Sequence, residues 1–243
     1  MPPRHALVTG ANRGLGLEFV RQLLAGGAHV VATCRQPGKA TALNTLAGEY
    51  PGRLHVLPLD VAAPKTHVEL ARELPLVLGE DGRLDLLVNN AGVLHSGERF
   101  GHLTLPNFDD SFRTNAAGPL LLTQALSPLL ADARPAQGLA GARVVNLSSE
   151  LGSIASTTRF GTPSYAMGKA AQNMATVLMA QALRERGIVV VALHPGWVRT
   201  DMGGEGATLA PAEAAAGILR VAGGLQPGDS GRFLDWRGRS VPW

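Results

Sequence analysis

The stretch His5-Ala6-Leu7-Val8-Thr9-Gly10-Ala11-Asn12-Arg13-Gly14-Leu15-Gly16 joins a short apolar run to a glycine-rich turn. The run predicts a buried strand, and apolar residues at helical spacing predict a helix after the turn, at Leu17, Phe19, Val20, Leu23 and Leu24. A strand, a glycine turn and a helix in this order direct backbone N–H groups and a helix N-terminus toward a pyrophosphate. The glycine spacing differs from the G-x-G-x-x-G fingerprint, however, and such turns also serve plain structure. Phosphate binding and a structural turn are therefore both open interpretations at this point.

The rest of the chain alternates between strand-like and helix-like segments. Apolar runs predict further strands at residues 28–34, 54–59, 84–89, 142–147, 188–193 and 231–234. Helical patterns separate them at residues 39–47, 68–78, 107–130, 165–186 and 211–222. This alternation predicts an α/β fold, a doubly wound parallel sheet of about seven strands with helices on both faces. No linker or repeat interrupts the pattern, so we expect residues 1–243 to form a single domain.

Composition excludes several classes of protein. Hydrophobic residues make up 45% of the 243 residues and charged ones 17%, which suits a well-buried globular core rather than a disordered chain. The single cysteine, Cys34, excludes a disulfide framework and suits the cytoplasm, and the seven histidines show no metal-ligand spacing. A net charge of +3 with scattered basic residues predicts no nucleic-acid partner. No apolar run reaches the ~18 residues of a membrane span, and a strand beginning at His5 leaves no room for a signal peptide.

Tyr165 and Lys169 form a Tyr-x-x-x-Lys pair near the start of a predicted helix. Residues four apart share one helix face, so both side chains can reach the same small volume. A nearby ammonium favours the phenolate and is expected to lower the pKa of the phenol toward neutrality. Lowering that pKa from ~10 to about 7 takes roughly 4 kcal/mol. Taken alone, such a pair is commonly an accident of a surface helix.

Seven motifs follow one another along the chain: Thr9-Gly10-x-x-x-Gly14-x-Gly16, Asp60-Val61, Asn89-Asn90-Ala91-Gly92, Asn115, Ser148-Ser149, Tyr165-x-x-x-Lys169 and Pro195-Gly196-x-Val198-x-Thr200. In this order they resemble the short-chain dehydrogenase/reductase family over essentially the whole chain. The segment from His194 to Gly204, with Gly231-Arg232-Phe233-Leu234-Asp235 and Trp243, is similar to the C-factor and sniffer-like carbonyl reductases. The resemblance implies a Rossmann fold that binds a nicotinamide cofactor.

The resemblance also implies catalytic roles. Tyr165 would donate a proton to a carbonyl oxygen, and Lys169 would lower the Tyr165 pKa and hold the nicotinamide ribose hydroxyls. Ser149, rather than Ser148, would hydrogen-bond the substrate oxygen, because the family uses the second hydroxyl of this pair. Asn115 would hold a water that extends a proton relay from Lys169. As ordinary structural residues, these hydroxyls would end a strand and Asn115 would kink a helix.

Further positions would bind the cofactor if the resemblance holds. Asp60 and Val61 would line the adenine pocket, while Val198 and Thr200 would anchor the nicotinamide amide. The remaining cofactor-binding positions implied are Gly10, Asn12, Arg13, Gly14, Leu15, Gly16, Arg35, Asn90, Ala91, Gly92, Tyr165, Lys169, Pro195 and Gly196.

The end of the second strand predicts the choice of cofactor. NAD-specific folds place Asp or Glu there, to bind the ribose 2′-hydroxyl. This chain has Cys34, followed by Arg35, and a guanidinium suits a 2′-phosphate. Arg13 in the glycine turn could approach the same phosphate from the other side. The expected cofactor is therefore NADP(H), unless both arginines are merely solvated loop residues.

Two functions fit these motifs. The first is an NADPH-dependent carbonyl reductase acting on a small carbonyl or alcohol, with an open cleft between the Gly-rich segment 201–210 and a wall carrying Ile154 and Phe160. The second is a C-factor-like regulatory protein that binds the cofactor with little turnover. The small residues of the Tyr165 helix suit either a core or an oligomer face, and we expect a homodimer or homotetramer.

Overall fold

Seven parallel strands form one sheet in the order β3-β2-β1-β4-β5-β6-β7 in the computed structural model, which describes residues 3–79, 82–134, 136 and 140–243. Every neighbouring pair is parallel, and β1 lies between β2 and β4. This order confirms the predicted doubly wound Rossmann fold. The strands are β1 His5–Thr9, β2 His29–Cys34, β3 Leu54–Pro58, β4 Leu86–Asn89, β5 Arg143–Leu147, β6 Val189–His194 and β7 Phe233–Asp235.

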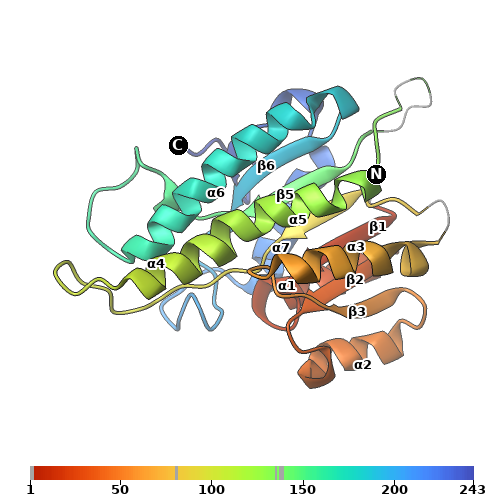
Figure 1. Ribbon diagram of the computed structural model, residues 1–243, viewed down its shortest axis with the longest axis horizontal. Coiled ribbons are helices and arrows are strands. Elements are labelled where there is room, and N and C mark those ends of the chain that lie inside the picture. Colours follow the sequence, from red (N-terminus) through yellow and green to blue (C-terminus); the bar gives the residue numbers. More distant parts are fainter. Residues whose placement is uncertain (1–2, 80–81, 135, 137–139) are drawn as a thin grey trace.

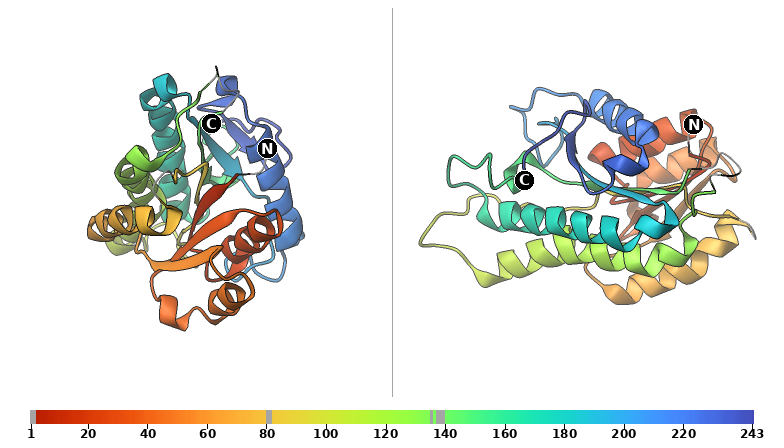
Figure 2. Two further views of the ribbon diagram at one scale, coloured as in Figure 1. Left: turned by 90° about the vertical axis from the view of Figure 1, so that its right-hand side faces the viewer. Right: turned by 90° about the horizontal axis from the view of Figure 1, so that it is seen from above.

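Helices cover both faces of the sheet, as Figures 1 and 2 show. One layer holds α1 Gly14–Ala25, α2 Thr41–Glu49 and α7 Pro211–Gly224. The other holds α3 Pro64–Leu78, α4 Leu105–Phe112, α5 Gly118–Leu126 and α6 Pro163–Ala182. Short 3-10 turns lie at Pro37–Lys39, Ser127–Leu129, Glu150–Gly152, Arg184–Arg186 and Pro227–Asp229.

The strands are apolar without interruption because both of their faces are buried. In β1, Ala6 and Val8 pack toward α1 and α7, whereas Leu7 packs toward α3 and α5. The two layers therefore enclose two separate apolar clusters, one on each side of the sheet. Among the described residues, none of the helices is long and apolar enough to span a membrane.

One predicted helix is divided in the structure. The segment expected as a single helix at 107–130 consists of α4, a π-helical segment at Arg113–Ala117, α5 and a 3-10 turn. Pro119 explains part of this, because it has no N–H to donate to the carbonyl of Asn115 four residues earlier. α4, the π-helical segment and α5 still run as one rod beside α6 (Figure 2, right).

The sheet order reverses direction on either side of β1. Ligands of open α/β sheets bind at this reversal, beyond the carboxyl ends of the strands. The loops after β1 and β4 therefore meet at the place where a dinucleotide is expected.

Candidate active site

The turn after β1 and the loop after β4 are tied together by Thr9 and Asn90. The Thr9 hydroxyl accepts the backbone N–H groups of Asn90 and Ala91, both at 3.0 Å. The Asn90 amide donates to the carbonyls of Thr9 at 2.8 Å and Gly10 at 3.1 Å. A Cβ on Gly10 would lie 2.9 Å from the Ala91 Cα, so a side chain there would force these loops apart.

The start of α1 is open to an anion. Gly14 and Gly10 have φ of 54° and 61°, which glycine adopts without strain. A Cβ on Gly16 would lie 2.3 Å from the Gly10 carbonyl oxygen, so close packing of turn and helix requires glycine there. No side chain caps α1 and no acidic residue occupies its first turn. The free N–H groups of the helix start therefore fit a pyrophosphate, and Asn12 and Leu15 belong to the same turn.

The ends of β2 and β3 carry the residues predicted to contact the adenosine half of the cofactor. Cys34 is buried at the strand end, and Arg35 follows it as an exposed residue. Asp60, after β3, uses one carboxylate oxygen to accept the Ala62 N–H at 3.0 Å and so forms a turn. Val61 is buried, and its carbonyl bonds the His67 ring at 3.0 Å. Asp60 thus stabilises the turn after β3.

Arg13, which could approach a 2′-phosphate, forms a surface ion pair in the structure. Its guanidinium pairs with Asp201 at 2.9 Å, and both side chains are exposed. This pairing arises because the loop after β6 passes over the glycine turn, so that a Cβ on Gly14 would lie 3.4 Å from the Thr200 Cγ2. Arg35, in contrast, makes no ion pair among the described residues.

The loop after β6 is fixed by its own packing. Gly196 has φ of 82°, and a Cβ there would lie 2.9 Å from Leu209. Val198 is buried and forms a parallel bridge with Leu209. Pro195 and Thr200 flank this segment, so the predicted nicotinamide motif and the glycine turn lie on the same edge of the sheet.

Asn115 lies in the π-helical segment and reaches across to the loop after β4. Its side chain exchanges two hydrogen bonds with the backbone of Val93, both at 2.8 Å, and donates to the Ser111 hydroxyl at 2.9 Å. A Cβ on Gly92 would lie 3.1 Å from the Asn115 side-chain oxygen and 3.8 Å from the Lys169 Nζ. Because Gly92 has no side chain, the loop after β4 can lie close to Asn115 and Lys169.

Tyr165 and Lys169 lie together on the first turns of α6, and both are buried. The Lys169 Nζ is 5.6 Å from the centroid of the Tyr165 ring. The expected lowering of the Tyr165 pKa is not what the structure gives, because burial raises that pKa to about 12 and a hydrogen bond with Ser149 only partly opposes it. Burial also lowers the pKa of Lys169 to about 7. The loss of hydration on burial thus affects both pKa values more than the attraction between a Lys169 ammonium and a Tyr165 phenolate does.

The two serines after β5 have different surroundings. Ser148 is buried and donates to the Asn173 side-chain oxygen at 2.6 Å. Ser149 is half-buried, accepts the Leu151 N–H at 3.2 Å and is the side chain that opposes the rise of the Tyr165 pKa. Ser149 is therefore the hydroxyl beside Tyr165.

Three site residues were missed by sequence reasoning. Gln172 accepts a hydrogen bond from Lys169 at 3.0 Å, and its place three residues further along the helix was the available signal. The Asn173 side chain accepts the Ser148 hydroxyl and donates to the carbonyl of Gly152. Glu98 accepts the backbone N–H and hydroxyl of Ser164 at 3.1 and 2.9 Å, a contact across 66 residues that no local pattern indicates.

His194 ends β6 next to this site. Its Nδ1 accepts the N–H of Glu150 at 3.2 Å, and burial lowers its pKa. Burial thus favours the neutral form of this hydrogen-bonded imidazole. It also lines a cavity of about 340 Å³, together with Glu150, Trp236 and Val241, which lies beside Ser149.

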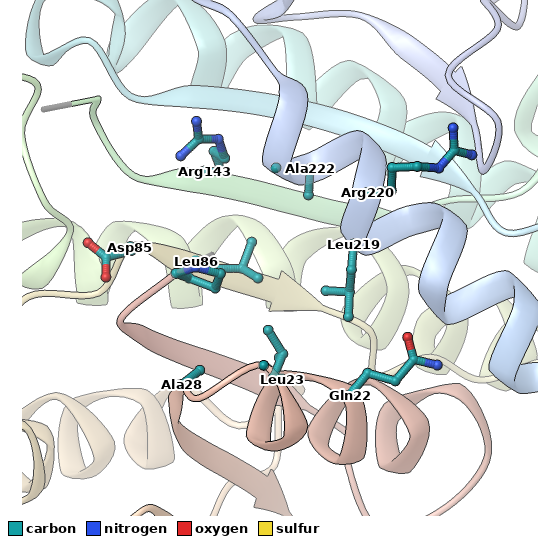
Figure 3. A pocket seen from close by; sticks show the side chains of 12 residues that line it. Gln22, Leu23, Ala28, Asp85, Leu86, Arg143, Leu219, Arg220 and Ala222 are labelled. Carbon is teal, nitrogen blue, oxygen red and sulfur yellow. The ribbon is translucent and has the colours of Figure 1, made fainter. Parts of the chain in front are cut away.

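A second cavity, of about 420 Å³, lies at the opposite edge of the sheet. Leu23 of α1 and Leu219 of α7 approach it from two sides, with Leu86 and Arg143 of the sheet behind them (Figure 3). These strand residues stand at the amino ends of β4 and β5. This cavity is therefore remote from Tyr165 and takes no part in the site.

Comparisons with known proteins agree with this geometry. The family model described as short chain dehydrogenase matches residues 4–208. The C-signal protein of Myxococcus xanthus is 46% identical over 162 residues, which covers 67% of this chain and 94% of that protein. The NADPH-bound carbonyl reductase from chicken fatty liver is 39% identical with a TM-score of 0.92, and all of both chains is covered. Carbonyl reductase Sniffer of D. melanogaster is 34% identical with a TM-score of 0.93, and 99% of both chains is covered.

The family match spans most of the chain, and the solved relatives share its seven-stranded sheet almost throughout. The protein is an oxidoreductase of the short-chain dehydrogenase/reductase family.

Proposed function

We propose that this protein is an NADPH-dependent carbonyl reductase that reduces an aldehyde or ketone, with Tyr165 as the proton donor. The observation that carries the proposal is that the Ser149 hydroxyl lies beside Tyr165, close enough to oppose the rise of the Tyr165 pKa. This pair sits beside the buried Lys169 on the edge of the sheet that holds the open glycine turn. Two adjacent hydroxyl donors are what a carbonyl oxygen needs as it gains negative charge.

Each residue of the site has its own role in the proposed reduction. The nicotinamide, when bound, supplies the hydride that reaches the carbonyl carbon. Ser149 hydrogen-bonds the carbonyl oxygen and holds it near Tyr165. With a pKa raised to about 12, Tyr165 keeps its proton at neutral pH and transfers it to the developing alkoxide. Lys169 holds the ribose hydroxyls and stabilises the phenolate that remains.

Asn115 and Lys169 extend this arrangement into the interior. Both lie next to Gly92, so a water held by Asn115 would reach the Lys169 ammonium and return a proton toward Tyr165. We therefore assign Asn115 to the proton relay. The π-helical segment supports this, since single π turns inside α-helices recur at functional sites.

We further propose NADP(H) as the cofactor. Cys34 in place of a carboxylate leaves nothing to repel a 2′-phosphate, and Arg35 is exposed directly beside it. The solved carbonyl reductase from chicken fatty liver binds NADPH and is similar over its whole length.

Apolar side chains at the mouth of the site favour varied apolar carbonyl compounds. Ile154 is exposed, and Phe160 packs edge-on against Phe100 with centroids 5.8 Å apart. Across the mouth, Trp197 is exposed while its ring N–H donates to the Gly203 carbonyl at 2.8 Å. Exposed aromatic side chains of this kind bind apolar groups without selecting one shape.

A regulatory role is the second candidate, because the C-signal protein is 46% identical to this chain. The test is the loss of NADPH absorbance with a panel of aldehydes and ketones that ranges from small aliphatic to aromatic. We expect turnover with several of them. Tight NADPH binding with no turnover across the panel would contradict the reductase and favour the regulatory role.

We also propose that the chain forms a dimer or tetramer through the layer that contains α6. Met167, Met174 and Leu178 recur on the outer face of α6 and are exposed. Phe112 of α4 and Leu121 of α5 add exposed apolar side chains on the neighbouring elements. An exposed apolar surface of this extent marks an interaction site.

A further inference from the structure

One face of α6 buries three polar side chains in a row. Lys169 is 3% exposed, and Gln172 and Thr176 are fully buried. The Lys169 ammonium donates to the backbone carbonyl of Leu147 at 2.5 Å and to the Gln172 side-chain oxygen at 3.0 Å. Within the described residues, Gln172 is thus the one side chain that hydrogen-bonds the ammonium.

The chemistry of the contact fixes the orientation of the Gln172 amide. An ammonium has donors but no acceptor, so the amide oxygen has to face it. The amide nitrogen then points into the interior, where it finds no acceptor in the described part of the chain. A buried donor without a partner disfavours folding, and an apolar side chain of similar size would avoid that loss. A residue kept at such a disadvantage indicates a role beyond packing.

We propose that Gln172 is a positioning residue, whose amide oxygen holds the Lys169 ammonium in place and in its charged form. The consequence for catalysis rests on the proposed function, since that function gives the ammonium its role toward the ribose and Tyr165. The contact itself stands independently of it.

The charge on Lys169 needs this support because burial alone lowers its pKa to about 7. Tyr165 is the titratable group beside it on its own helix. The elements packed against this part of α6 carry Asp109, Asp110, Arg113, Glu150 and His194. Asp110 bonds His95 and Glu150 lies beside His194, and desolvation is the sole cause found for the pKa of Lys169. The polar contacts that face the amine are the carbonyl oxygens of Leu147 and Gln172, and of these only that of Gln172 belongs to a side chain that a substitution can change.

Two substitutions are expected to move this pKa in opposite directions. Gln172→Leu removes the carbonyl dipole, so the pKa of Lys169 falls. Gln172→Glu places a carboxylate at the same point, so that pKa rises. The part of the NADPH affinity that depends on the Lys169 ammonium is present at pH values below the pKa of Lys169 and is lost above it. The loss of NADPH affinity should thus move to lower pH in the Leu variant and to higher pH in the Glu variant, by roughly one pH unit each.

The experiment measures the dissociation constant of NADPH by its fluorescence from pH 6 to 10, with thermal unfolding of the same proteins without cofactor. Thr176→Val is the matched control, because Thr176 is equally buried on this face but bonds Asn146 and the Gln172 backbone rather than Lys169. We expect unshifted titration for the control and, for Gln172→Leu, a melting temperature no lower than that of the wild type. Above the wild-type transition, NADPH should bind Gln172→Leu up to ~10-fold more weakly.

Unshifted titrations in Gln172→Leu and Gln172→Glu would overturn the proposal, as would an equal shift in Thr176→Val. A lower melting temperature for Gln172→Leu without a pH shift would mean that Gln172 only packs. If the Glu variant does not fold, Gln172→Met replaces it as a second apolar test with the expected shift to lower pH. The binding readout keeps this inference separate from the proposed function, which fails instead if the wild type reduces no carbonyl of the panel.

Discussion

At the scale of single residues, the proposed preference for NADPH depends on Cys34 and Arg35. A charge-assisted hydrogen bond from a guanidinium contributes ~1.5–3 kcal/mol, equivalent to roughly 10- to 100-fold in affinity. Because Arg13 is paired with Asp201, we attribute most of this preference to Arg35. The contact lies at the surface, so binding of NADPH should weaken with increasing salt.

The Cys34→Asp, Arg35→Ala double variant should reverse this preference. A carboxylate at position 34 can bind a ribose 2′-hydroxyl and repels a 2′-phosphate, and the guanidinium is removed. The measurement is kcat/KM for NADPH and for NADH in the wild type and the variant, with Arg13→Ala as control. A wild type that favours NADH, or a ratio that the double variant leaves unchanged, would contradict the assignment.

Ser148 and Ser149 show what a sequence can and cannot predict about a site. The motif placed two hydroxyls at the end of β5, and the resemblance favoured the second of them. Their difference depends on Asn173, which takes the Ser148 hydroxyl, and on the start of α6, which brings Tyr165 to Ser149. The pKa of Tyr165 escaped prediction for the same reason, since helix spacing gives the neighbouring Lys169 but not the burial of both groups.

At the scale of elements, α6 begins under an unusual constraint. Thr162 adopts a left-handed φ of 40° before Pro163, and its side chain does not cap the helix. Glu98, from the loop after β4, supplies the cap instead by accepting the Ser164 N–H and hydroxyl. Glu98 therefore anchors the start of α6, and its negative charge also interacts favourably with the positive end of the helix dipole.

Glu98→Ala should destabilise the protein by about 1 kcal/mol, because the Ser164 N–H loses its acceptor. For a chain of this size that corresponds to a fall of roughly 2–4 °C in melting temperature. Glu69→Ala is the control, since Glu69 lies exposed on α3 and makes only a loose pair with Lys65. Equal melting temperatures for both variants would show that Glu98 does not anchor α6.

Strands and helices were predicted correctly where the local sequence pattern determines them. The strands were predicted within about two residues, because their apolar runs reflect burial on both faces. The helix predicted at 107–130 was wrong as a single α-helix, since its division depends on Pro119 and on the contact of Asn115 with Val93. Glu98 was not predicted because its partner Ser164 is set by tertiary packing, whereas the helical spacing of Gln172 from Lys169 was a local signal that went unused.

At the scale of the whole molecule, the exposed apolar face of α4, α5 and α6 should determine the oligomeric state. Met174→Lys places a charge at the centre of the α6 stripe, where desolvation in an interface would be costly. We expect this variant to be a monomer by size-exclusion chromatography with light scattering, whereas the wild type is a dimer or tetramer. Leu76→Lys is the control, because Leu76 is the same kind of exposed apolar residue on α3. A monomeric wild type, or dissociation by both variants, would contradict this face as the interface.

The central claim is that the whole fold serves to place one proton donor, Tyr165, beside a bound nicotinamide. The most direct test compares kcat for reduction of a carbonyl by NADPH in the wild type, Tyr165→Phe and Tyr50→Phe. Tyr50 is the other tyrosine of the chain, half-buried at the end of α2 beneath Arg53 and distant from the site in sequence and fold. We expect Tyr165→Phe to lose at least ~100-fold in kcat with NADPH affinity nearly unchanged, and Tyr50→Phe to keep its kcat. Turnover of Tyr165→Phe within a few-fold of the wild type would contradict the account.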